Sequence, residues 1–417
     1  MTDAPREAAP RRAISQPEFV AMMAVLFATI AFSIDAMLPA LPQIAAELSP
    51  EAPNRAQLVL TSFVLGMGVG TLIAGPLSDA LGRKATITGA VGLYCVGAAM
   101  AIYATSLEML LAARVIQGLG AAGPRIVSMA MVRDLFEGRA MARIMSFIMM
   151  IFVLIPAIAP SIGSLIMMGF GWQGIFAAFI LFGLIGASWL NLRQPETLPA
   201  DRRRPLNTVA LKEAFLEVVR HRMVRLYIVV LTLGFGQMFA FLSSIQQIYD
   251  EIFGKADSFP IWFAVAGILS GGGTILNATL VMRLGMRRLA IAAFATQTVI
   301  AGSLLVVSLL GLMPDALAFP AFWLWSISIF FMAGLVFGNL NALALQPMGH
   351  IAGMAASVVG AISTVFAVVI AAPIGLAFDG TLVPLTAGTL ICSGLAWWLM
   401  RQSREADPEP KRMVPTH

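Results

Sequence analysis

Three ionisable side chains lie inside long apolar stretches of this chain: Asp35, Arg114 and Arg125. A charge inside a bilayer costs roughly 2.5–3.5 kcal/mol on insertion scales, so a residue of this kind is a functional candidate. Burial disfavours the charged form of a carboxyl group, which is the property that a proton carrier needs. Asp35 is therefore the candidate for proton coupling. The alternative is a carboxylate at a helix end near outer water, which Pro39 just beyond it would fit.

Arg114 belongs to the segment Arg114-Val115-Ile116-Gln117-Gly118-Leu119-Gly120. A guanidinium does not readily lose its proton, so we expect Arg114 to influence a nearby acid during proton coupling rather than to carry the proton. Arg125 follows eleven positions later, close to three helical turns, and shares the same helix face nearer the cytoplasm. It either lines a substrate cavity or extends to the inner surface.

A very short polar segment separates two of the apolar stretches, and it contains Gly75, Asp79, Gly82, Arg83 and Lys84. Because both flanking stretches are long enough to cross a bilayer, the segment has to turn the chain sharply at the membrane surface. We expect Asp79 and Arg83 to form charge pairs with neighbouring helix ends. The spacing of these residues resembles the signature loop between the second and third helices of the major facilitator superfamily of transporters, and this resemblance implies a gating motif.

The second half of the chain has no convincing buried acid and offers amides and aromatic rings instead. With Arg125, the candidates for lining a substrate cavity are Gln237, Phe241, Asn277, Asn339 and Asn341. Amides inside a membrane need hydrogen-bond partners, which a polar heterocycle could supply. The alternative is hydrogen bonding between helices.

Pro156, Pro160 and Gly163 follow one another within a single apolar stretch. Proline removes a helix hydrogen bond and glycine lets two backbones approach, so this stretch should bend and pack closely. The stretch resembles a motif of antiporters, which implies proton-exchange antiport; the alternative is a purely structural kink, which needs the same residues.

Methionines at positions 141, 145 and 149 form a stripe along one helix face. Sulfur ligands suit Cu(I), but a stripe of this kind is more often packing. The three histidines fall in loops or tails, so no histidine relay crosses the membrane. We expect no metal site and no cofactor. Neither an ATPase signature nor a pairing of nucleophile and base occurs, so we expect no enzyme activity and an ion gradient as the energy source.

Composition decides the class of protein. The chain is 59% hydrophobic and 12% charged, whereas soluble domains average about 25% charged residues. A spanning helix needs roughly 20 apolar residues. The sequence therefore predicts an all-α integral membrane protein with twelve spanning helices, near 19–41, 58–78, 85–105, 108–132, 143–168, 172–192, 226–248, 259–281, 289–312, 319–345, 353–377 and 383–400.

The net charge of +5 reflects topology rather than binding to nucleic acid. With the N-terminus inside, only Arg55 and Lys255 of the 27 Lys and Arg residues lie in outward loops, and two more lie within a span. The other 23 face the cytoplasm, which is the positive-inside pattern. We expect a multi-pass protein of the bilayer with both termini cytoplasmic.

The longest polar interruption divides the spans into six and six. We expect a six-helix bundle over 1–192, a cytoplasmic linker with a short amphipathic helix over 193–225, and a second six-helix bundle with a tail over 226–417. A weak repeat supports two related halves: Gly82-Arg83-Lys84 is echoed by Arg283-Leu284-Gly285-Met286-Arg287-Arg288, with Met282 in place of the acid. The alternative is chance similarity among glycines and prolines.

Several of these segments together resemble the major facilitator superfamily, and its Bcr/CflA group in particular. They are Asp35 to Pro42, Gly75 to Lys84, Arg114 to Ala122, Arg133-Asp134-Leu135-Phe136 and Ala159 to Gly163. The resemblance implies two six-helix bundles, a monomer, and transport in the bacterial inner membrane. Gly123-Pro124-Arg125 and Gly138 to Phe147 look closer to the branch of CcoA-like copper importers and RfnT-like riboflavin importers. This chain departs from the copper importers, because it has a lone Met238 and no histidine in the eighth span.

The function hypothesis is a secondary active transporter that moves a small organic solute by alternating access. The first candidate is uptake of an aromatic nutrient such as riboflavin. The alternative is a proton-coupled multidrug efflux antiporter of the Bcr/CflA type, and copper import comes third. A membrane enzyme or receptor would need a soluble domain or a catalytic cluster, which the sequence does not show.

Overall fold

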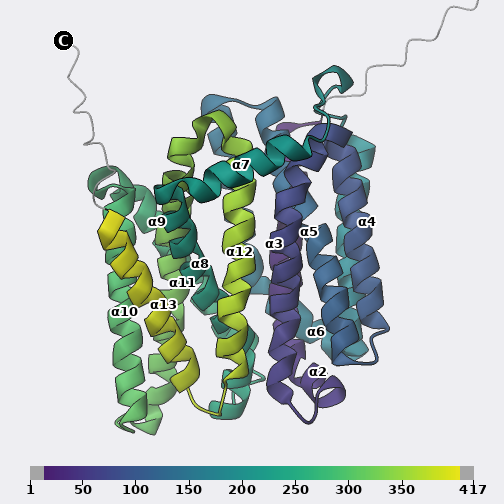
Figure 1. Ribbon diagram of the computed structural model, residues 1–417. Coiled ribbons are helices and arrows are strands. Elements are labelled where there is room, and N and C mark those ends of the chain that lie inside the picture. Colours follow the sequence, from purple (N-terminus) through teal and green to yellow (C-terminus); the bar gives the residue numbers. More distant parts are fainter. Residues whose placement is uncertain (1–13, 404–417) are drawn as a thin grey trace, which may run out of the picture.

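A computed structural model describes residues 14–403, and over that range the chain is helical with no strand. The helices run mostly parallel to one another as long rods (Figure 1). This is the arrangement that a bilayer imposes, because a helix satisfies every backbone hydrogen bond within its own segment. The two chain ends, whose cytoplasmic placement the charge pattern predicts, lie outside the described residues.

The first half begins with α1 (Gln16–Asp35), which ends at the candidate carboxylate. The chain then makes two short turns and a short helix before the next crossing. The elements of this half are η1 (Leu38–Ala40), α2 (Leu41–Leu48), η2 (Pro53–Gln57), α3 (Leu58–Leu81), α4 (Arg83–Ile102), α5 (Leu107–Leu135) and α6 (Gly138–Arg193). Gly171, with φ of 63°, interrupts α6 and turns the chain back across the membrane.

The second half repeats this plan after a linker that contains η3 (Ala200–Arg202) and α7 (Thr208–Arg220). Its elements are α8 (Arg222–Gln247), η4 (Ile248–Ile252), α9 (Phe259–Leu284), α10 (Met286–Leu309), α11 (Asp315–Leu345), η5 (Gln346–Ile351), α12 (Ala352–Leu376) and α13 (Val383–Gln402). The amphipathic α7 lies across the ends of the other helices (Figure 1). It buries Val218 and exposes its charged residues, as an interfacial helix does.

Within residues 14–403, ten apolar helical runs are long enough to cross a membrane. Two of them hold two crossings each: α6, which turns at Gly171, and the run over α11 and α12, which η5 interrupts. The described range therefore makes twelve crossings, six on each side of the linker. Each crossing agrees with a predicted span to within a few residues, because a long apolar run is stable in a bilayer only as a spanning helix.

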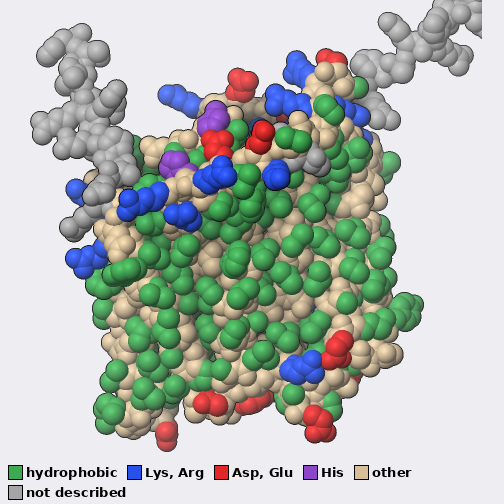
Figure 2. Space-filling view, viewed as in Figure 1, with side chains coloured by type: hydrophobic (Ala, Val, Ile, Leu, Met, Phe, Trp, Pro, Cys, Tyr) green, Lys and Arg blue, Asp and Glu red, His purple; other side chains and the backbone are tan. Residues whose placement is uncertain are grey.

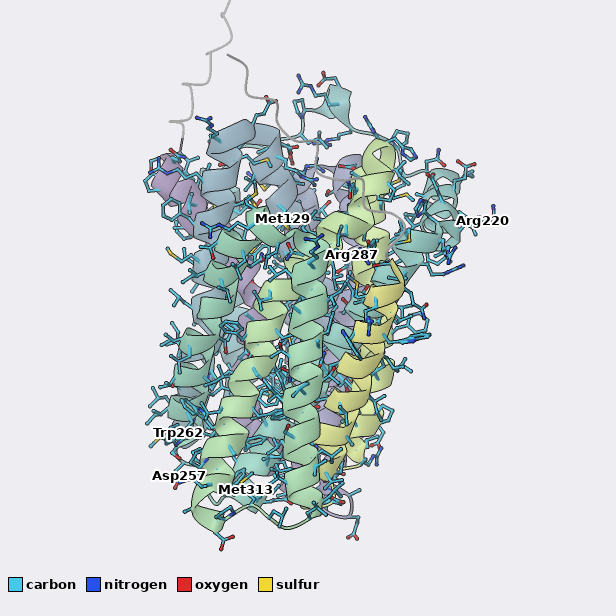
Figure 3. The ribbon with its side chains drawn as sticks, turned by 90° about the vertical axis from the view of Figure 1, so that its left-hand side faces the viewer. Met129, Arg220, Asp257, Trp262, Arg287 and Met313 are labelled. Atoms are coloured by element: carbon cyan, nitrogen blue, oxygen red, sulfur yellow. The ribbon has the colours of Figure 1, made fainter. Side chains whose placement is uncertain are left out.

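The outer wall of the bundle is apolar, and the charges gather at its two ends (Figure 2). Lys and Arg side chains crowd the end that carries α7, and the opposite end shows mostly acids. Figure 3 places Arg220 and Arg287 at the first end and Asp257 at the other. This separation of charge is what the positive-inside rule describes.

The two halves meet along α3 and α12. A Cβ at Gly68 would lie 3.2 Å from the backbone nitrogen of Val365, and one at Gly75 would lie 3.2 Å from Ser357 Oγ. Small residues therefore let these helices touch near the middle and near the end that carries α7. The stripe of Met141, Met145 and Met149 packs against an apolar core cluster of the first half.

Candidate functional site

Asp35 ends α1 in the interior of the protein. Its side chain is buried, with 4% of the residue exposed, and no described residue gives it a hydrogen bond or an ion pair. The chain turns immediately after it, at Ala36 and Met37, which are also buried. Burying a charged carboxylate without a cation or a hydrogen-bond donor beside it is costly.

Arg114 of α5 is completely buried, and its hydrogen bonds within the described residues go to an amide and to two backbone carbonyls rather than to Asp35. Its guanidinium donates to Gln117 Oε1 at 2.7 Å, to the Ser33 carbonyl at 3.0 Å and to the Val59 carbonyl at 3.2 Å. Ser33 lies two residues before Asp35. The expected link between the arginine and the acid is therefore made through the backbone of α1.

Aromatic rings and a tyrosine complete this buried polar centre. The Arg114 guanidinium carbon lies 4.4 Å from the centroid of the Phe63 ring and 5.8 Å from that of Phe176, distances at which a cation is attracted to the ring face. The Tyr94 hydroxyl lies 2.6 Å from Ser33 Oγ. Sequence reasoning did not single out Tyr94, because a tyrosine in an apolar run is more often a packing residue.

The motif of Pro156, Pro160 and Gly163 lies in α6, against the turn that follows Asp35. A Cβ on Gly163 would collide with the carbonyl oxygen of Ala36, the next residue after Asp35. Glycine is therefore required for α6 to approach this turn. Both prolines lie inside the helix, which continues past them.

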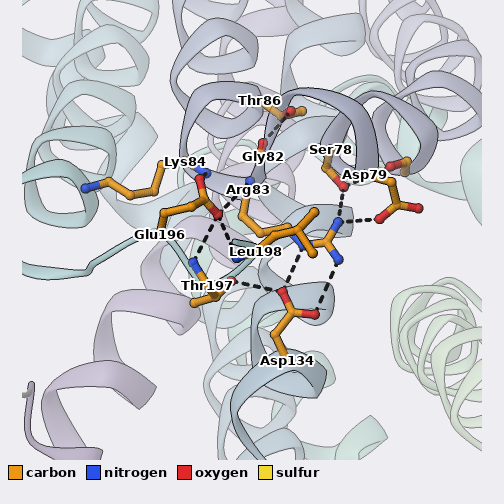
Figure 4. Close-up of polar contacts among 11 residues, drawn as sticks. Ser78, Asp79, Gly82, Arg83, Lys84, Thr86, Asp134, Glu196, Thr197 and Leu198 are labelled. Carbon is orange, nitrogen blue, oxygen red and sulfur yellow. Dashed lines mark hydrogen bonds and ion pairs between the residues drawn. The ribbon is translucent and has the colours of Figure 1, made fainter. Parts of the chain in front are cut away.

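The polar loop between α3 and α4 forms the charge network that its spacing predicts (Figure 4). Gly82 has φ of 98°, a conformation that glycine adopts easily, and it ends α3 and begins α4. Arg83 donates to Asp79 Oδ1 and, through Nε at 2.9 Å, to Asp134 Oδ2. Asp134 lies at the C-terminal end of α5, so Arg83 joins three helix ends.

Glu196, at the start of the linker, completes this network. Its Oε1 accepts the Arg83 backbone N–H at 2.9 Å, and its Oε2 accepts that of Lys84 at 3.0 Å (Figure 4). A carboxylate at the first turn of a helix satisfies free N–H groups and opposes the positive end of the helix dipole. Thr197 adds a hydroxyl that donates to Asp134 Oδ2 at 2.9 Å.

Sequence reasoning missed the roles of Asp134 and Glu196. Asp134 had no role beyond its place in the family resemblance, and Glu196 was treated as part of a linker. The signal was available for Glu196: it stands in Gln194-Pro195-Glu196-Thr197-Leu198, directly after the sixth crossing. An acid at that place returns to the same membrane face as the α3–α4 loop.

The candidate cavity residues of the second half do not form one cluster. Asn339 of α11 donates to Asn277 Oδ1 of α9 at 2.7 Å, which is a hydrogen bond between helices. Asn341 donates to the Phe337 carbonyl of its own helix at 2.8 Å. These contacts fit the alternative, interhelical reading for Asn277 and Asn339.

Gln237 differs from these asparagines. It is fully buried in α8, and neither its Oε1 nor its Nε2 has a hydrogen-bond partner among the described residues. One helical turn later, Phe241 packs edge-on against Trp325 and Phe330, at 5.9 and 5.5 Å between ring centroids. An unpaired amide beside aromatic rings is what a site for a heterocycle would present.

Arg125 lies in α5, with its guanidinium carbon 5.9 Å from the centroid of the Phe27 ring of α1. The side chain is partly buried, and its Nε has no partner among residues 14–403. Its cation therefore faces α1, the helix that ends at Asp35.

Comparison with known proteins agrees with this architecture. The chain is 31% identical over 351 residues to a bicyclomycin resistance protein homolog of Haemophilus influenzae, covering 82% of this chain and 85% of that protein. It is 30% identical over 226 residues to the multidrug resistance protein MdtL of Escherichia coli, covering 53% and 55%.

Solved structures show the same fold at low sequence identity. An auto-inhibited peptide transporter of the POT family matches with a TM-score of 0.71 and 16% identity, over 96% of this chain and 99% of that one. A D-xylose–proton symporter matches with a TM-score of 0.69 and 14% identity, over 91% and 97%. The model of the Major Facilitator Superfamily matches residues 22–373. This chain is thus a multi-pass membrane protein that belongs to the Major Facilitator Superfamily of secondary transporters.

Proposed function

We propose that this protein exports small organic molecules, drugs among them, in exchange for protons across the bacterial inner membrane. The observation that carries the proposal is the buried, unpaired carboxyl group of Asp35 at the end of α1. A negatively charged carboxylate is costly in this buried setting, and binding of an incoming proton removes the charge. The names of the two relatives support export of drugs rather than uptake of riboflavin.

Proton exchange at Asp35 has a direct structural path to the surrounding helices. Arg114 holds the α1 backbone through the Ser33 carbonyl, and Gly163 of α6 contacts the Ala36 carbonyl on the other side of the acid. When Asp35 loses its proton, its charge has to find water or a donor. The end of α1 then moves toward water, and its contacts with α5 and α6 shift those two helices as well.

The network of Asp79, Arg83, Asp134 and Glu196 acts in this proposal as the inner gate. It fixes the inner ends of α3, α4 and α5 relative to the linker. With both chain ends cytoplasmic, this network faces the cytoplasm. A rigid inner rim lets the first half rock as one body, which transport between paired halves requires.

The substrate site of this proposal lies beside Gln237 and Phe241. Binding of a ring with a polar edge would pair the free amide of Gln237, one helical turn before the buried Phe241, once the two halves move apart. Replacing Gln237 by leucine removes the amide and keeps the bulk. We expect this variant to raise the KM for polar heterocycles several-fold and to leave purely apolar dyes nearly unaffected.

Drug tolerance and proton exchange test the proposal together. Expression of the protein in a drug-sensitive bacterium should raise tolerance to bicyclomycin or to a dye, and Asp35→Asn should abolish the increase. Drug addition to energised inverted vesicles should release protons with the original protein and not with Asp35→Asn. Glu51→Gln, at an exposed acid on the outer end, is the matched control and should behave as the unaltered protein. Full tolerance with Asp35→Asn would contradict the proposal.

Riboflavin uptake has a separate test, because growth of a riboflavin-requiring strain on low external vitamin does not depend on export. Growth that depends on this protein would replace the export proposal. Copper import would call for sulfur ligands, and the methionine stripe of Met141, Met145 and Met149 packs against an apolar core cluster, which supports a packing role instead.

A further inference from the structure

The outer end of the protein carries amide side chains that join the two halves. Gln57 and Asn54 belong to η2 of the first half, and Gln247 ends α8 of the second half. Gln57 Nε2 donates to Gln247 Oε1 at 2.7 Å, and Gln247 Nε2 donates to Asn54 Oδ1 at 2.8 Å. These two hydrogen bonds cross between residues 190 and 193 positions apart in the sequence.

Two further contacts extend the connection. Asn54 Nδ2 donates to the Phe378 carbonyl at 2.6 Å and to the Leu376 carbonyl at 3.3 Å, both at the outer end of α12. Ser244 Oγ of α8 donates to Gln57 Oε1 at 3.0 Å. Every side-chain oxygen and nitrogen of Asn54 and Gln57 is therefore hydrogen-bonded to the second half.

The backbone of α12 is shaped to receive Gln57. A Cβ at Gly375 would collide with Gln57 Oε1 and would lie 3.2 Å from Ser243 Oγ. Any other residue at position 375 would displace the amide from its place. The glutamine is 4% exposed, so water does not compete for its polar atoms.

We propose that Asn54, Gln57 and Gln247 form an outer latch that holds the extracellular side closed in one state of the transport cycle. The latch consists of neutral amides, so closing it requires no charge to leave water. Each hydrogen bond stabilises the closed state by about fivefold, enough to hold it and weak enough to release it. This inference rests on alternating access between the two halves and is independent of which substrate or ion is moved.

Distance measurements across the outer face test the latch without any substrate. Spin labels are attached at Glu51→Cys and Asp257→Cys, two exposed outer positions in different halves. Double electron–electron resonance then measures the distance between the two labels. Cys95 and Cys392 are replaced by alanine in this background. The short distance should dominate with the latch intact. Gln247→Ala removes both bonds between amides, and the ratio of long to short distances should rise about tenfold or more.

The matched control is Gln43→Ala. Gln43 is also an amide at the outer end, but it donates to Glu47 Oε1 of its own helix at 2.8 Å and does not bridge the halves. It should leave the distance distribution unchanged. An unchanged distribution in Gln247→Ala, or an equal shift in Gln43→Ala, would overturn the latch.

A second variant guards against loss of folding. Gly375→Ala disturbs Gln57 from the opposite helix and should increase the long distance in the same direction. Thermal unfolding identifies which variants keep the fold, and the distances of those variants decide the question. If transport proves not to be proton-driven export but these distances shift as expected, the latch stands and only the proposed function fails.

Discussion

The α3–α4 turn and the α9–α10 turn have the same backbone shape but differ in chemistry. Gly82 has φ of 98° and ψ of 161°, and Gly285 has φ of 80° and ψ of 152°. In each turn, the glycine ends one crossing and begins the next. The repeat inferred from sequence therefore has a structural counterpart, as two halves related by a parallel repeat should have.

The charged positions of the first turn are methionines in the second. Asp79 lies three residues before its glycine and Arg83 one residue after it; the equivalent residues of the second turn are Met282 and Met286. The Asp79 side chain is 52% exposed within its ion pair, whereas Met282 is 86% exposed.

The comparison teaches that the turn does not require the charges. The second turn forms without an acid at position 282 or a base at 286, so a glycine between two apolar helices suffices for the geometry. The segment after the sixth crossing of each half does return to its turn: Glu196 accepts N–H groups of Arg83 and Lys84, and Ser403 Oγ accepts from Arg287 Nε at 2.7 Å. We therefore expect the charges of the first turn to have a role other than forming the turn.

Loss of Arg83 should have the largest effect. Arg83→Ala leaves Asp134 and Asp79 without their cation, which should destabilise the network by about 2 kcal/mol of free energy. This value is below the range for fully buried ion pairs, because the Asp79 side chain is 52% exposed. We expect transport in proteoliposomes to fall about tenfold or more, with little change in substrate affinity. Met286→Ala, at the same position of the second turn, should transport at nearly the original rate. Equal losses in both variants would contradict a special role for the first turn.

Replacing the turn glycine of each half by alanine distinguishes the effect of backbone strain from the effect of disturbing the Arg83 network. Both Gly82→Ala and Gly285→Ala force a side chain into a positive φ, at about 1–3 kcal/mol each. A Cβ at position 82 would also lie 2.9 Å from Glu196 Oε2, whereas one at 285 meets nothing within 4 Å. We expect similar losses of thermal stability but a clearly lower transport rate for Gly82→Ala. Equal transport rates would show that strain alone accounts for the effect.

The crossings and the α3–α4 turn could be predicted from sequence because each depends on local properties. An apolar run of about 20 residues has few alternatives in a bilayer, and glycine between two such runs predicts a turn. The pairing of Arg83 with Asp79 also follows, since the two lie four residues apart. The same reasoning placed Asp35 within an apolar stretch but left a helix end near outer water as the alternative; the residue does end α1, and it is buried there.

Contacts between distant segments could not be predicted in this way. Arg114 was expected beside an acid, but its donors point to the carbonyls of Val59 and Ser33, which only the packing of α1 and α3 against α5 brings near. Asn277 and Asn339 were separate candidates until their helices placed them in one hydrogen bond. Backbone carbonyls carry no sequence signal, so a single chain gives no means of finding them.

Loss of Glu196 should have a moderate effect. Glu196→Ala frees the first N–H groups of α4, and loss of a helix cap costs about 0.5–2 kcal/mol. We expect a small fall in thermal stability and a transport rate reduced by a few-fold, since Arg83 keeps its partner Asp134. Glu213→Ala, at an exposed acid of α7 in the same linker, should change neither quantity. Identical behaviour of the two variants would mean that the linker does not support the first turn.

The smallest effect is expected when the charges are transplanted. Met282→Asp combined with Met286→Arg recreates in the second turn the four-residue spacing of Asp79 and Arg83. An exposed pair at this spacing contributes only about 0.3–0.5 kcal/mol, and the inner end of α11 offers no acid equivalent to Asp134, since Leu343, Ala344 and Leu345 stand there. The unfolding temperature should therefore be nearly unchanged, and the transport rate should stay within about twofold of the original rate. A loss as large as that of Arg83→Ala would mean that the cycle depends on an uncharged second turn, and the difference between the halves would then itself be part of the mechanism.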